Sequence, residues 1–303
     1  MTALGLDIGG SSIKAVLVRG CRVVGVARSA SYTRPDRDRL RECLRMCWQS
    51  LQAPNDVHIV GLCLPGVLAA DRSMVVQAVN LPGLERVPLH DLVAGTLERN
   101  VSITVFNDAH ATTFGYWIEH PSNDRMLGLA IGTGVGACVL DSGRWLTITD
   151  ASSGHIGQID VGPCGGEHDQ PLGPDGGRNT LEGYLGARAL LARYGDAFPD
   201  MLGSIPMDDP PMRALVRTLR ICHAIYQPQR VVLLGGVGIR LAPQLNAIRH
   251  AVCTELTSLA RPGWTLEVGT SDHHAAAGAA CLATMPPGSE RSPVCANAQR
   301  PNS

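Results

Sequence analysis

The segment LGLDIGGSSIKAVLV, residues 4–18, decides the fold class of this chain. Its two apolar runs, at 4–8 and 13–18, flank a glycine- and serine-rich turn at 9–12, which predicts two strands joined by a tight turn. Glycine lets backbone N–H groups come close to an anion, and serine hydroxyls add further donors. The turn is therefore a candidate phosphate site.

Asp7 stands at the end of the first predicted strand, directly before that turn. A carboxylate beside a phosphate is repelled unless a cation lies between the two, so Asp7 is a candidate for holding Mg²⁺ through water. The alternative is a local hydrogen bond from the backbone of Gly9 or Gly10 to the Asp7 carboxylate, as in an ordinary turn. The residues alone leave both interpretations open.

Two more glycine-rich turns follow predicted strands. A strand at 125–131 leads into GTGVG at 132–136, and a strand at 231–234 leads into GGVG at 235–238. One such turn is usually part of a hairpin, but three of them, at the beginning, middle and end of the chain, favour a phosphate-binding site. None matches the pattern of a P-loop or of a dinucleotide-binding G-x-G-x-x-G that opens a helix.

Asn107 and Asp108 close a strand predicted at 102–106 and precede a predicted helix at 109–119. Proteins of the α/β class place their sites at the carboxyl ends of strands, where an aspartate can accept a proton from a hydroxyl group. The alternative is that Asp108 caps the N-terminus of the helix. One residue can do both, so capping does not exclude catalysis.

Length and composition exclude several classes of protein. The chain has 303 residues, of which 45% are hydrophobic and 17% charged, and this predicts a globular protein with two lobes. A formal net charge of −1 argues against binding of nucleic acid or of an anionic membrane. We find no apolar run long enough for a membrane span, no secretory signal and only scattered cysteines. We therefore expect a cytoplasmic protein that binds small molecules.

Several residues outside these motifs receive ordinary structural interpretations. Lys14 is the only lysine of the chain and lies on the second predicted strand, but its rarity is not evidence of catalysis. The histidines outside the motifs are expected to be surface or capping residues. They are His90, His223, His250, His273 and His274.

Six segments of the chain share their order and spacing with a known family. They are LGLDIGGSSIKAVLV at 4–18, VNLPGL at 79–84, VFNDAHA at 105–111, LAIGTGVGACVL at 129–140, VVLLGGVG at 231–238 and DHHAAAGAACLA at 272–283. Together they resemble the ROK sugar kinases, within the actin–hexokinase–heat-shock-protein superfamily. The resemblance covers nearly the whole chain to about residue 284, and the ordered set is far more specific than any one segment.

The resemblance implies an α/β fold of two RNase-H-like lobes, as in actin-like ATPases, with a cleft for nucleotide and sugar between them. The N-terminal lobe would comprise residues 1–106, joined by the C-terminal helix at 273–285, and the C-terminal lobe residues 107–272. A homodimer is a further expectation from the resemblance. Residues 286–303 are rich in Pro, Ser and Asn, and they predict a disordered tail.

The resemblance also implies an ATP-dependent kinase that uses Mg²⁺ and phosphorylates the 6-hydroxyl of a hexose, glucose by default, or of an N-acyl-hexosamine. Asp108 would be the base that takes the hydroxyl proton. The sugar-binding residues would be Gly66, Asn80, Asn107, Asp108, His155, Gln158 and Glu182. The nucleotide-binding residues would be Asp7, Gly9, Gly10, Ser11, Ser12, Gly132, Thr133, Gly134, Gly136, Gly235 and Gly236.

The chain departs from the family pattern in the loop that binds sugar and zinc. Typical members carry G-E-x-G-H where this chain has GHIGQ at 154–158, and a cysteine-rich zinc run where it has residues 173–182 without cysteine. With the expected ligands all absent, we expect no zinc site. His155 in place of Glu modestly favours a sugar other than plain glucose, because N-acetylmannosamine kinases that resemble this family also place His there.

Two other functions compete with a sugar kinase. Some ROK proteins are transcriptional repressors, but these carry a helix-turn-helix before the first phosphate turn, whereas this chain reaches Asp7 almost at once. A non-catalytic regulatory protein that binds sugar or nucleotide is the stronger alternative, because the zinc ligands and two sugar contacts have changed. Asp7, the phosphate turns and Asp108 argue against it, since a binding protein needs no base.

Overall fold

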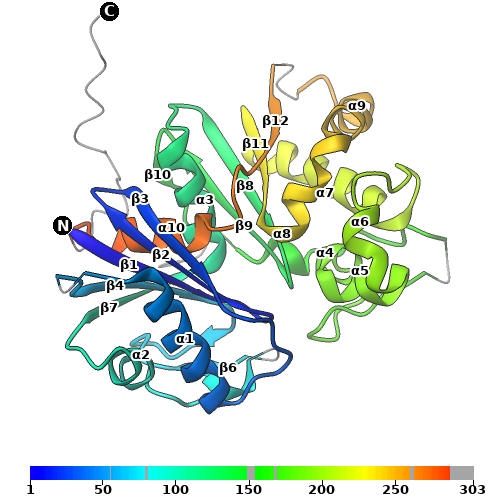
Figure 1. The fold of residues 1–303 in the computed structure, drawn as a ribbon. Coiled ribbons are helices and arrows are strands. Elements are labelled where there is room, and N and C mark those ends of the chain that lie inside the picture. The colour runs from blue at the N-terminus through cyan, green and yellow to red at the C-terminus, as the bar shows by residue number, and fades with distance from the viewer. Residues whose placement is uncertain (55, 79–80, 149–153, 167–168, 260–262, 287–303) are drawn as a thin grey trace, which may run out of the picture.

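The computed structural model describes residues 1–286 except 55, 79–80, 149–153, 167–168 and 260–262. Within this part of the chain, two five-stranded sheets are each covered by helices (Figure 1). This arrangement confirms the predicted α/β fold with two lobes. The exact division at residues 106 and 272 stays a prediction, and the proposed tail lies almost entirely outside the described residues.

The first sheet has the strand order β3-β2-β1-β4-β7. Its strands are β1 (Thr2–Ile8), β2 (Ile13–Arg19), β3 (Arg22–Arg28), β4 (Ile59–Leu64) and β7 (Ser102–Asn107). β1 pairs antiparallel with β2 and parallel with β4, and β4 pairs parallel with β7. The parallel strands β1, β4 and β7 therefore end at the same edge of the sheet, which places Asp7 and Asn107 at that edge.

The two faces of the first sheet pack against different helices, because successive side chains of a strand point to opposite sides. Leu4 and Leu6 of β1 belong to the core beneath helices α1 (Arg37–Leu51) and α2 (Leu89–Leu97). Ala3 of β1 and Val16 of β2 belong instead to the core around helix α10 (His274–Ala283). By this alternation, Asp7 lies on the face that α10 covers.

The second sheet repeats the plan of the first. Its order is β10-β9-β8-β11-β12, with β8 (Arg125–Ile131), β9 (Val135–Asp141), β10 (Arg144–Trp145), β11 (Arg230–Leu234) and β12 (Thr265–Val268). β8 pairs antiparallel with β9 and parallel with β11, as β1 does with β2 and β4. The duplication is visible in the topology although the sequence shows no repeat of fixed period.

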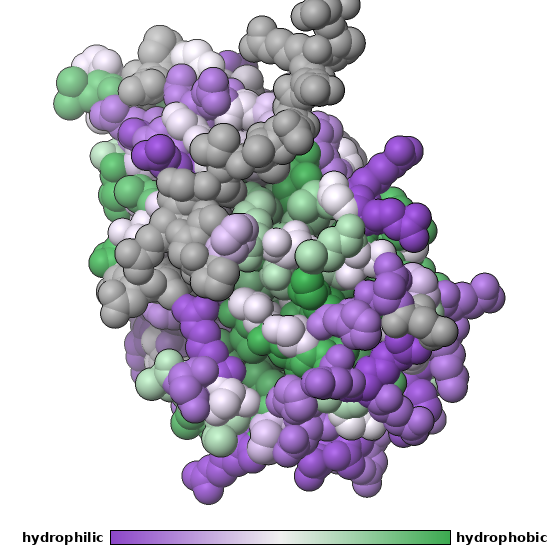
Figure 2. Space-filling view, turned by 90° about the vertical axis from the view of Figure 1, so that its left-hand side faces the viewer, coloured by the Kyte–Doolittle hydropathy of each residue, from purple (hydrophilic) through white to green (hydrophobic). Residues whose placement is uncertain are grey.

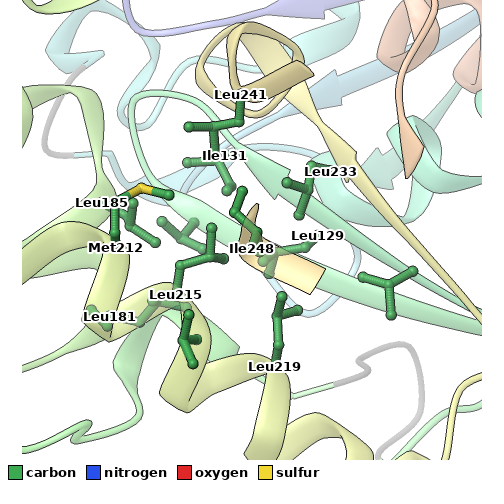
Figure 3. Packing of buried hydrophobic residues seen from close by; sticks show 14 of the residues in the cluster. Leu129, Ile131, Leu181, Leu185, Met212, Leu215, Leu219, Leu233, Leu241 and Ile248 are labelled. Atoms are coloured by element: carbon green, nitrogen blue, oxygen red, sulfur yellow. The ribbon is translucent and has the colours of Figure 1, made fainter. Parts of the chain in front are cut away.

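Helices on the second sheet enclose the largest core of the molecule. They are α4 (Leu181–Leu185), α5 (Ala187–Tyr194), α6 (Phe198–Met201), α7 (Pro210–Tyr226) and α9 (Leu245–Glu255). Figure 3 shows Leu129 and Ile131 of β8 beside Leu215 of α7 and Ile248 of α9, all of them fully buried. The short elements are β5 (Val67–Leu68), β6 (Val75–Gln77), α8 (Gly235–Gly238) and 3₁₀ turns at Pro82–Leu84, Ile156–Gln158, Gly195–Ala197 and Ile239–Gln244.

Helices α10 and α3 (Asp108–Glu119) lie against each other between the two sheets (Figure 1). Their backbones touch at glycines. A Cβ atom on Gly278 of α10 would lie 1.9 Å from the Ala111 carbonyl oxygen of α3, and one on Gly61 of β4 would lie 1.9 Å from the Ala279 carbonyl oxygen of α10. No side chain fits in such a gap, so glycine is required for this close approach.

The structure differs from the sequence predictions in two details. Residues 235–238 form the short helix α8 rather than a turn, because Gly235 takes a left-handed φ of +77° and starts the helix directly after β11. Two histidines predicted at the surface are buried: His223 packs its ring 4.5 Å from that of Trp264, and His274 lies 3.3 Å from the Glu119 carboxylate. Both side chains are buried by tertiary packing, since Trp264 covers His223 on α7 and α10, which begins at His274, lies against α3 between the sheets.

The surface is mixed in character. On the face seen in Figure 2, hydrophobic surface gathers near the centre and hydrophilic side chains surround it. β3 is an edge strand, and Val24 and Val26 on it are about half exposed, at 52% and 53%. Among the helices of the described residues, none has the length and apolar character that crossing a membrane requires.

We expect Gly278→Ala to destabilise the protein by about 1–3 kcal/mol, because the added methyl group forces the backbones of α10 and α3 apart. Gly95→Ala in α2 is the matched control. It meets no heavy atom within 4 Å and should stabilise by about 0.5–1 kcal/mol through helix propensity. Urea unfolding followed by circular dichroism measures both, and equal effects of the two substitutions would contradict the packing argument.

Candidate active site

The first glycine-rich turn is tied down at both of its ends. The Gly9 N–H donates to the Ser12 carbonyl at 3.1 Å, and the Tyr32 hydroxyl donates to the Gly9 carbonyl at 2.7 Å. The Tyr32 N–H also donates to the Ser11 carbonyl at 2.9 Å. Because these bonds use carbonyl groups of the turn, they hold its shape while Gly10 and Ser11 remain accessible at the surface.

Asp7 and Lys14 face each other across the first hairpin. They are register partners on β1 and β2, and the Lys14 Nζ lies 3.5 Å from the Asp7 Oδ2. Both side chains are largely buried, at 14% exposure for Asp7 and 18% for Lys14. Burial raises the pKa of Asp7, and the Lys14 ammonium opposes this rise. The ion pair with Lys14 thus stabilises the ionised Asp7 carboxylate in a largely buried position.

Asp7 also meets the requirements for the predicted magnesium. Mg²⁺ at a nucleotide is usually held by one or two carboxylates, by water and by phosphate oxygens. Asp7 supplies one carboxylate beside the turn, and among the described residues there is no cluster of three or more metal-binding side chains. The donor set therefore fits a cation that the nucleotide itself mainly holds, and the assignment stays a prediction.

The second turn, at 132–136, lies against Glu182. The Gly132 N–H donates to the Gly134 carbonyl at 2.9 Å, and the Val135 N–H donates to the Glu182 carboxylate at 2.9 Å. Thr180 caps α4 by accepting from the Gly183 N–H, which fixes Glu182 in the first turn of that helix. Burial raises the pKa of Glu182.

Asp108 begins α3 at the edge where the parallel strands end. The Asn107 side chain caps the helix by accepting from the Ala109 and His110 N–H groups, and the Asp108 carboxylate accepts from the Ala109 N–H at 2.8 Å. The alternative that Asp108 caps the helix is therefore wrong, because the cap is Asn107 and Asp108 is the first residue of α3. Asp108 is left with a carboxylate that only its own helix end engages in the described structure.

Three carboxylates are close enough for their charges to interact. Burial, helped by the negative charges of Asp7 and Glu182, raises the pKa of Asp108 to about 6. Cys63, the register partner of Asp7 on β4, also has its pKa raised by burial and by Asp7 and Asp108. The fold thus brings together the ends of β1, β7 and the start of α4.

Two hollows contain neighbours of this cluster of carboxylates: Asn107, which precedes Asp108, lines one, and Asp272, whose charge acts on Asp7, lines the other. The first, of about 250 Å³, includes Gly66, Asn107 and His155, three residues that the resemblance assigns to sugar. The second, of about 420 Å³, includes Gly236, which the resemblance assigns to adenosine. The other lining residues are Leu64, Leu68, Ala69, Ala70 and Arg72 in the first hollow and Ile239, Arg240, Thr270, Ser271 and Asp272 in the second.

Comparison with known proteins agrees with this architecture. The sequence profile of the ROK family matches residues 3–285. This chain belongs to the ROK family. It is 25% identical over 271 residues to a glucokinase of Thermotoga maritima, covering 77% of this chain and 81% of that one. It is 28% identical over 275 residues to an N-acetylmannosamine kinase of Citrobacter koseri, covering 84% and 90%.

A solved ROK structure shares the fold. The ROK glucokinase from Streptomyces griseus, solved with glucose and AMPPNP, superposes with a TM-score of 0.72 at 20% sequence identity, covering 93% of this chain and 99% of that one. The two-lobed actin-like architecture expected from the sequence is thereby confirmed.

Not every predicted residue of this ROK protein lies at the hollows. Gln158 is exposed at the end of a 3₁₀ turn and does not line the first hollow, and Asn80 lies outside the described residues. Gly235 packs against the end of β8, since a Cβ there would lie 2.5 Å from the Ile131 carbonyl oxygen. That contact places the third glycine segment beside the second.

Two site residues of this ROK protein escaped the sequence analysis. Lys14 is paired with Asp7, and the hairpin register of residues 4–18 would have indicated that pairing. Arg72 lines the first hollow, and nothing in the sequence around it signalled this. Of the residues that could have replaced the family's zinc ligands, Cys164 is buried and its Sγ contacts Gly162 and Arg217, while His168 lies outside the described residues.

The raised pKa of Asp108 makes a prediction about stability. An unfolded chain loses this proton near pH 4, whereas the folded chain keeps it to about pH 6, so Asp108 costs stability as the pH rises from 4 to 6. Asp108→Asn should match the wild type near pH 4 and exceed its unfolding free energy by about 3 kcal/mol at pH 8, since each pKa unit corresponds to about 1.4 kcal/mol.

Urea unfolding at the two pH values measures this difference. Asp91→Asn, at an exposed acid in the first turn of α2, is the control and should stay within about 0.5 kcal/mol of the wild type at both. A destabilised Asp108→Asn at pH 8 would contradict the prediction.

Proposed function

We propose that this protein is a sugar kinase that transfers the γ-phosphoryl group of ATP to the 6-hydroxyl of a hexose or N-acyl-hexosamine. The observation that carries the proposal is the position of Asp108. Its carboxylate stands next to Asn107, which lines the first hollow, and is coupled to Asp7 beside the first phosphate turn. A base placed between a sugar site and a phosphate site serves phosphoryl transfer.

In the proposed step, the sugar O6 attacks the γ-phosphorus of ATP. The new O6–P bond forms as the bond between the γ-phosphorus and the β–γ bridging oxygen breaks, and ADP leaves with that electron pair. The O6 proton passes to the Asp108 carboxylate. With a pKa of about 6, Asp108 is largely ionised at pH 7 and is still basic enough to accept this proton.

The remaining residues bind and orient the two substrates. Gly66, Asn107, His155 and Glu182 would hold the sugar, and Asn80 and Gln158 are retained as weaker expectations from the resemblance. The turns at 9–12 and 132–136 would cradle the phosphates through backbone N–H groups, and Gly235 and Gly236 would border the adenosine. Mg²⁺, held by Asp7 through water, would neutralise phosphate charge. Such positioning and charge neutralisation account for most of phosphoryl-transfer catalysis.

The relatives support this assignment by what their names describe. A glucokinase and an N-acetylmannosamine kinase are among the proteins that this chain resembles in sequence, and the similar Streptomyces griseus structure contains glucose and an ATP analogue. Both sugars have a primary 6-hydroxyl, which is the acceptor proposed here.

The proposal predicts sugar-dependent ADP release that Asp108→Asn lowers by about 10²–10⁴-fold in kcat, because the variant has no base. The assay couples ADP release to a dehydrogenase signal and uses glucose, mannose, allose, fructose, N-acetylglucosamine and N-acetylmannosamine with Mg-ATP. Wild-type kcat/KM should fall below about pH 6 as Asp108 takes up a proton. If no sugar causes ADP release while the folded protein still binds ATP, the result would favour the non-catalytic alternative.

Lys14 is expected to contact the ATP phosphates, because it lies beside the phosphate turn and is paired only with Asp7 in the described structure. As the only lysine of the chain, it can be followed with an amine-specific reagent and peptide mass spectrometry. ATP and ADP should protect Lys14 from labelling and AMP should not. Lys14→Met should raise the KM for ATP about tenfold and leave the sugar KM unchanged, with Lys14→Arg as the charge-conserving control. Equal protection by AMP would contradict this role.

A further inference from the structure

Arg72 is presented to the first hollow by a rigid turn between β5 and β6. The Ala69 N–H donates to the Met74 carbonyl at 3.0 Å, and the Arg72 N–H donates to the Ala69 carbonyl at 2.8 Å. Arg72 itself has a φ of +56°, a left-handed conformation that is uncommon for a side chain of this size. The turn therefore holds Arg72 in place at some conformational cost.

In the described structure, one guanidinium nitrogen of Arg72 donates a hydrogen bond, which leaves further N–H donors for a ligand. One of its N–H groups donates to the Val105 carbonyl of β7 at 3.2 Å, two residues before Asn107, and a guanidinium carries five such donors. The nearest acid in sequence, Asp71, is engaged by the backbone N–H and the hydroxyl of Ser73, at 3.0 and 2.7 Å. Within the described part of the chain, no carboxylate forms an ion pair with Arg72.

The described residues that line the hollow beside Arg72 include no carboxylate. Its described lining consists of five aliphatic or glycine residues before Arg72 in the chain, the Asn107 amide and the His155 imidazole. The described lining therefore presents a guanidinium and an imidazole to a bound group, without an opposing carboxylate. Asp108 follows Asn107 in the chain, and its carboxylate interacts with the charges of Asp7 and Glu182.

The charge of Arg72 also acts on its other neighbour, His110. Burial and the positive charge of Arg72 together lower the pKa of His110 to about 4. His110 is therefore neutral at pH 7, with its ring 4.9 Å from that of Trp145. It neither competes with Arg72 for an anion nor neutralises it.

We propose that Arg72 and His155 form an anion subsite in the sugar hollow, and that the acceptor is a sugar carrying a carboxylate or phosphate away from its reacting hydroxyl. A guanidinium binds either group through two parallel hydrogen bonds, which a neutral sugar cannot offer in the same way. The proposal rests on the proposed function for the place of the reacting hydroxyl beside Asp108. The anion subsite itself depends only on Arg72 and His155 in the lining of the first hollow, and not on the proposed catalytic step.

Isothermal titration calorimetry with matched sugars, in low salt and without ATP, tests the subsite. The pairs are N-acetylmuramic acid against N-acetylglucosamine, for a carboxylate, and glucose 1-phosphate against glucose, for a phosphate. We expect the anionic member of at least one pair to bind about tenfold or more tightly, as a charge-assisted hydrogen-bond pair allows. The pair that shows the preference identifies the kind of anion.

Three variants assign the preference to Arg72. Arg72→Gln should abolish it, and Arg72→Lys should retain part of it, because a lysine keeps the charge without the two parallel donors. Arg86→Gln is the matched control: Arg86 is also exposed, has a φ of +58°, and bonds through its N–H to Val75 of the same hairpin, but it does not line the hollow. It should keep the full preference.

The outcomes separate the two proposals. An anion preference that needs Arg72, without phosphorylation of any sugar, supports the subsite and overturns the proposed kinase activity. Phosphorylation of neutral sugars with equal or weaker binding of their anionic partners overturns the subsite and leaves the kinase intact. A preference that survives in Arg72→Gln also overturns the subsite, and if no sugar of either class binds, both proposals fail.

Discussion

The packing of α10 against β1, β4 and α3 is the constraint on which the rest of this structure depends. At Gly5, Gly61, Gly115 and Gly278, an added Cβ would lie 2.0 Å or less from a backbone oxygen of the facing element. Backbone therefore meets backbone, and the last helix of the chain is locked onto the first sheet and onto α3. Because Asp108 is the first residue of α3, this packing determines the position of the proposed base relative to Asp7.

That placement gives the site its electrostatic character. Asp7, Asp108 and Glu182 come from distant parts of the chain, and burial raises the pKa of each. At Asp108 the negative charges of Asp7 and Glu182 contribute to the rise. Lys14 offsets the charge at Asp7, while Arg72 supplies positive charge to the lining of the first hollow. The site is thus acidic where phosphoryl transfer is proposed and basic where the body of the sugar would lie.

Patterns of a few residues predicted correctly those features that depend only on neighbours in the sequence. The three glycine segments, the strand ends at Asp7 and Asn107, and the helix that starts at Asp108 all follow from patterns a few residues long. Local reasoning was wrong for His223 and His274, whose burial depends on what packs over α7 and α10. The repeated plan of the two sheets followed from the family resemblance and not from a repeat in the sequence, since strand order survives in the fold without a matching period.

By itself, the sequence determined the α/β class, the family and the strand-end positions of the main site residues, because turn chemistry and hydrophobic pattern are properties of short segments. Only the tertiary structure decided which of these residues meet. Asp108 acquires its raised pKa, Lys14 its acidic partner and Arg72 its place in the sugar hollow from elements that are far apart in the chain. Burial and charge coupling depend on distances in space, and those arise only when the two sheets close around α3 and α10.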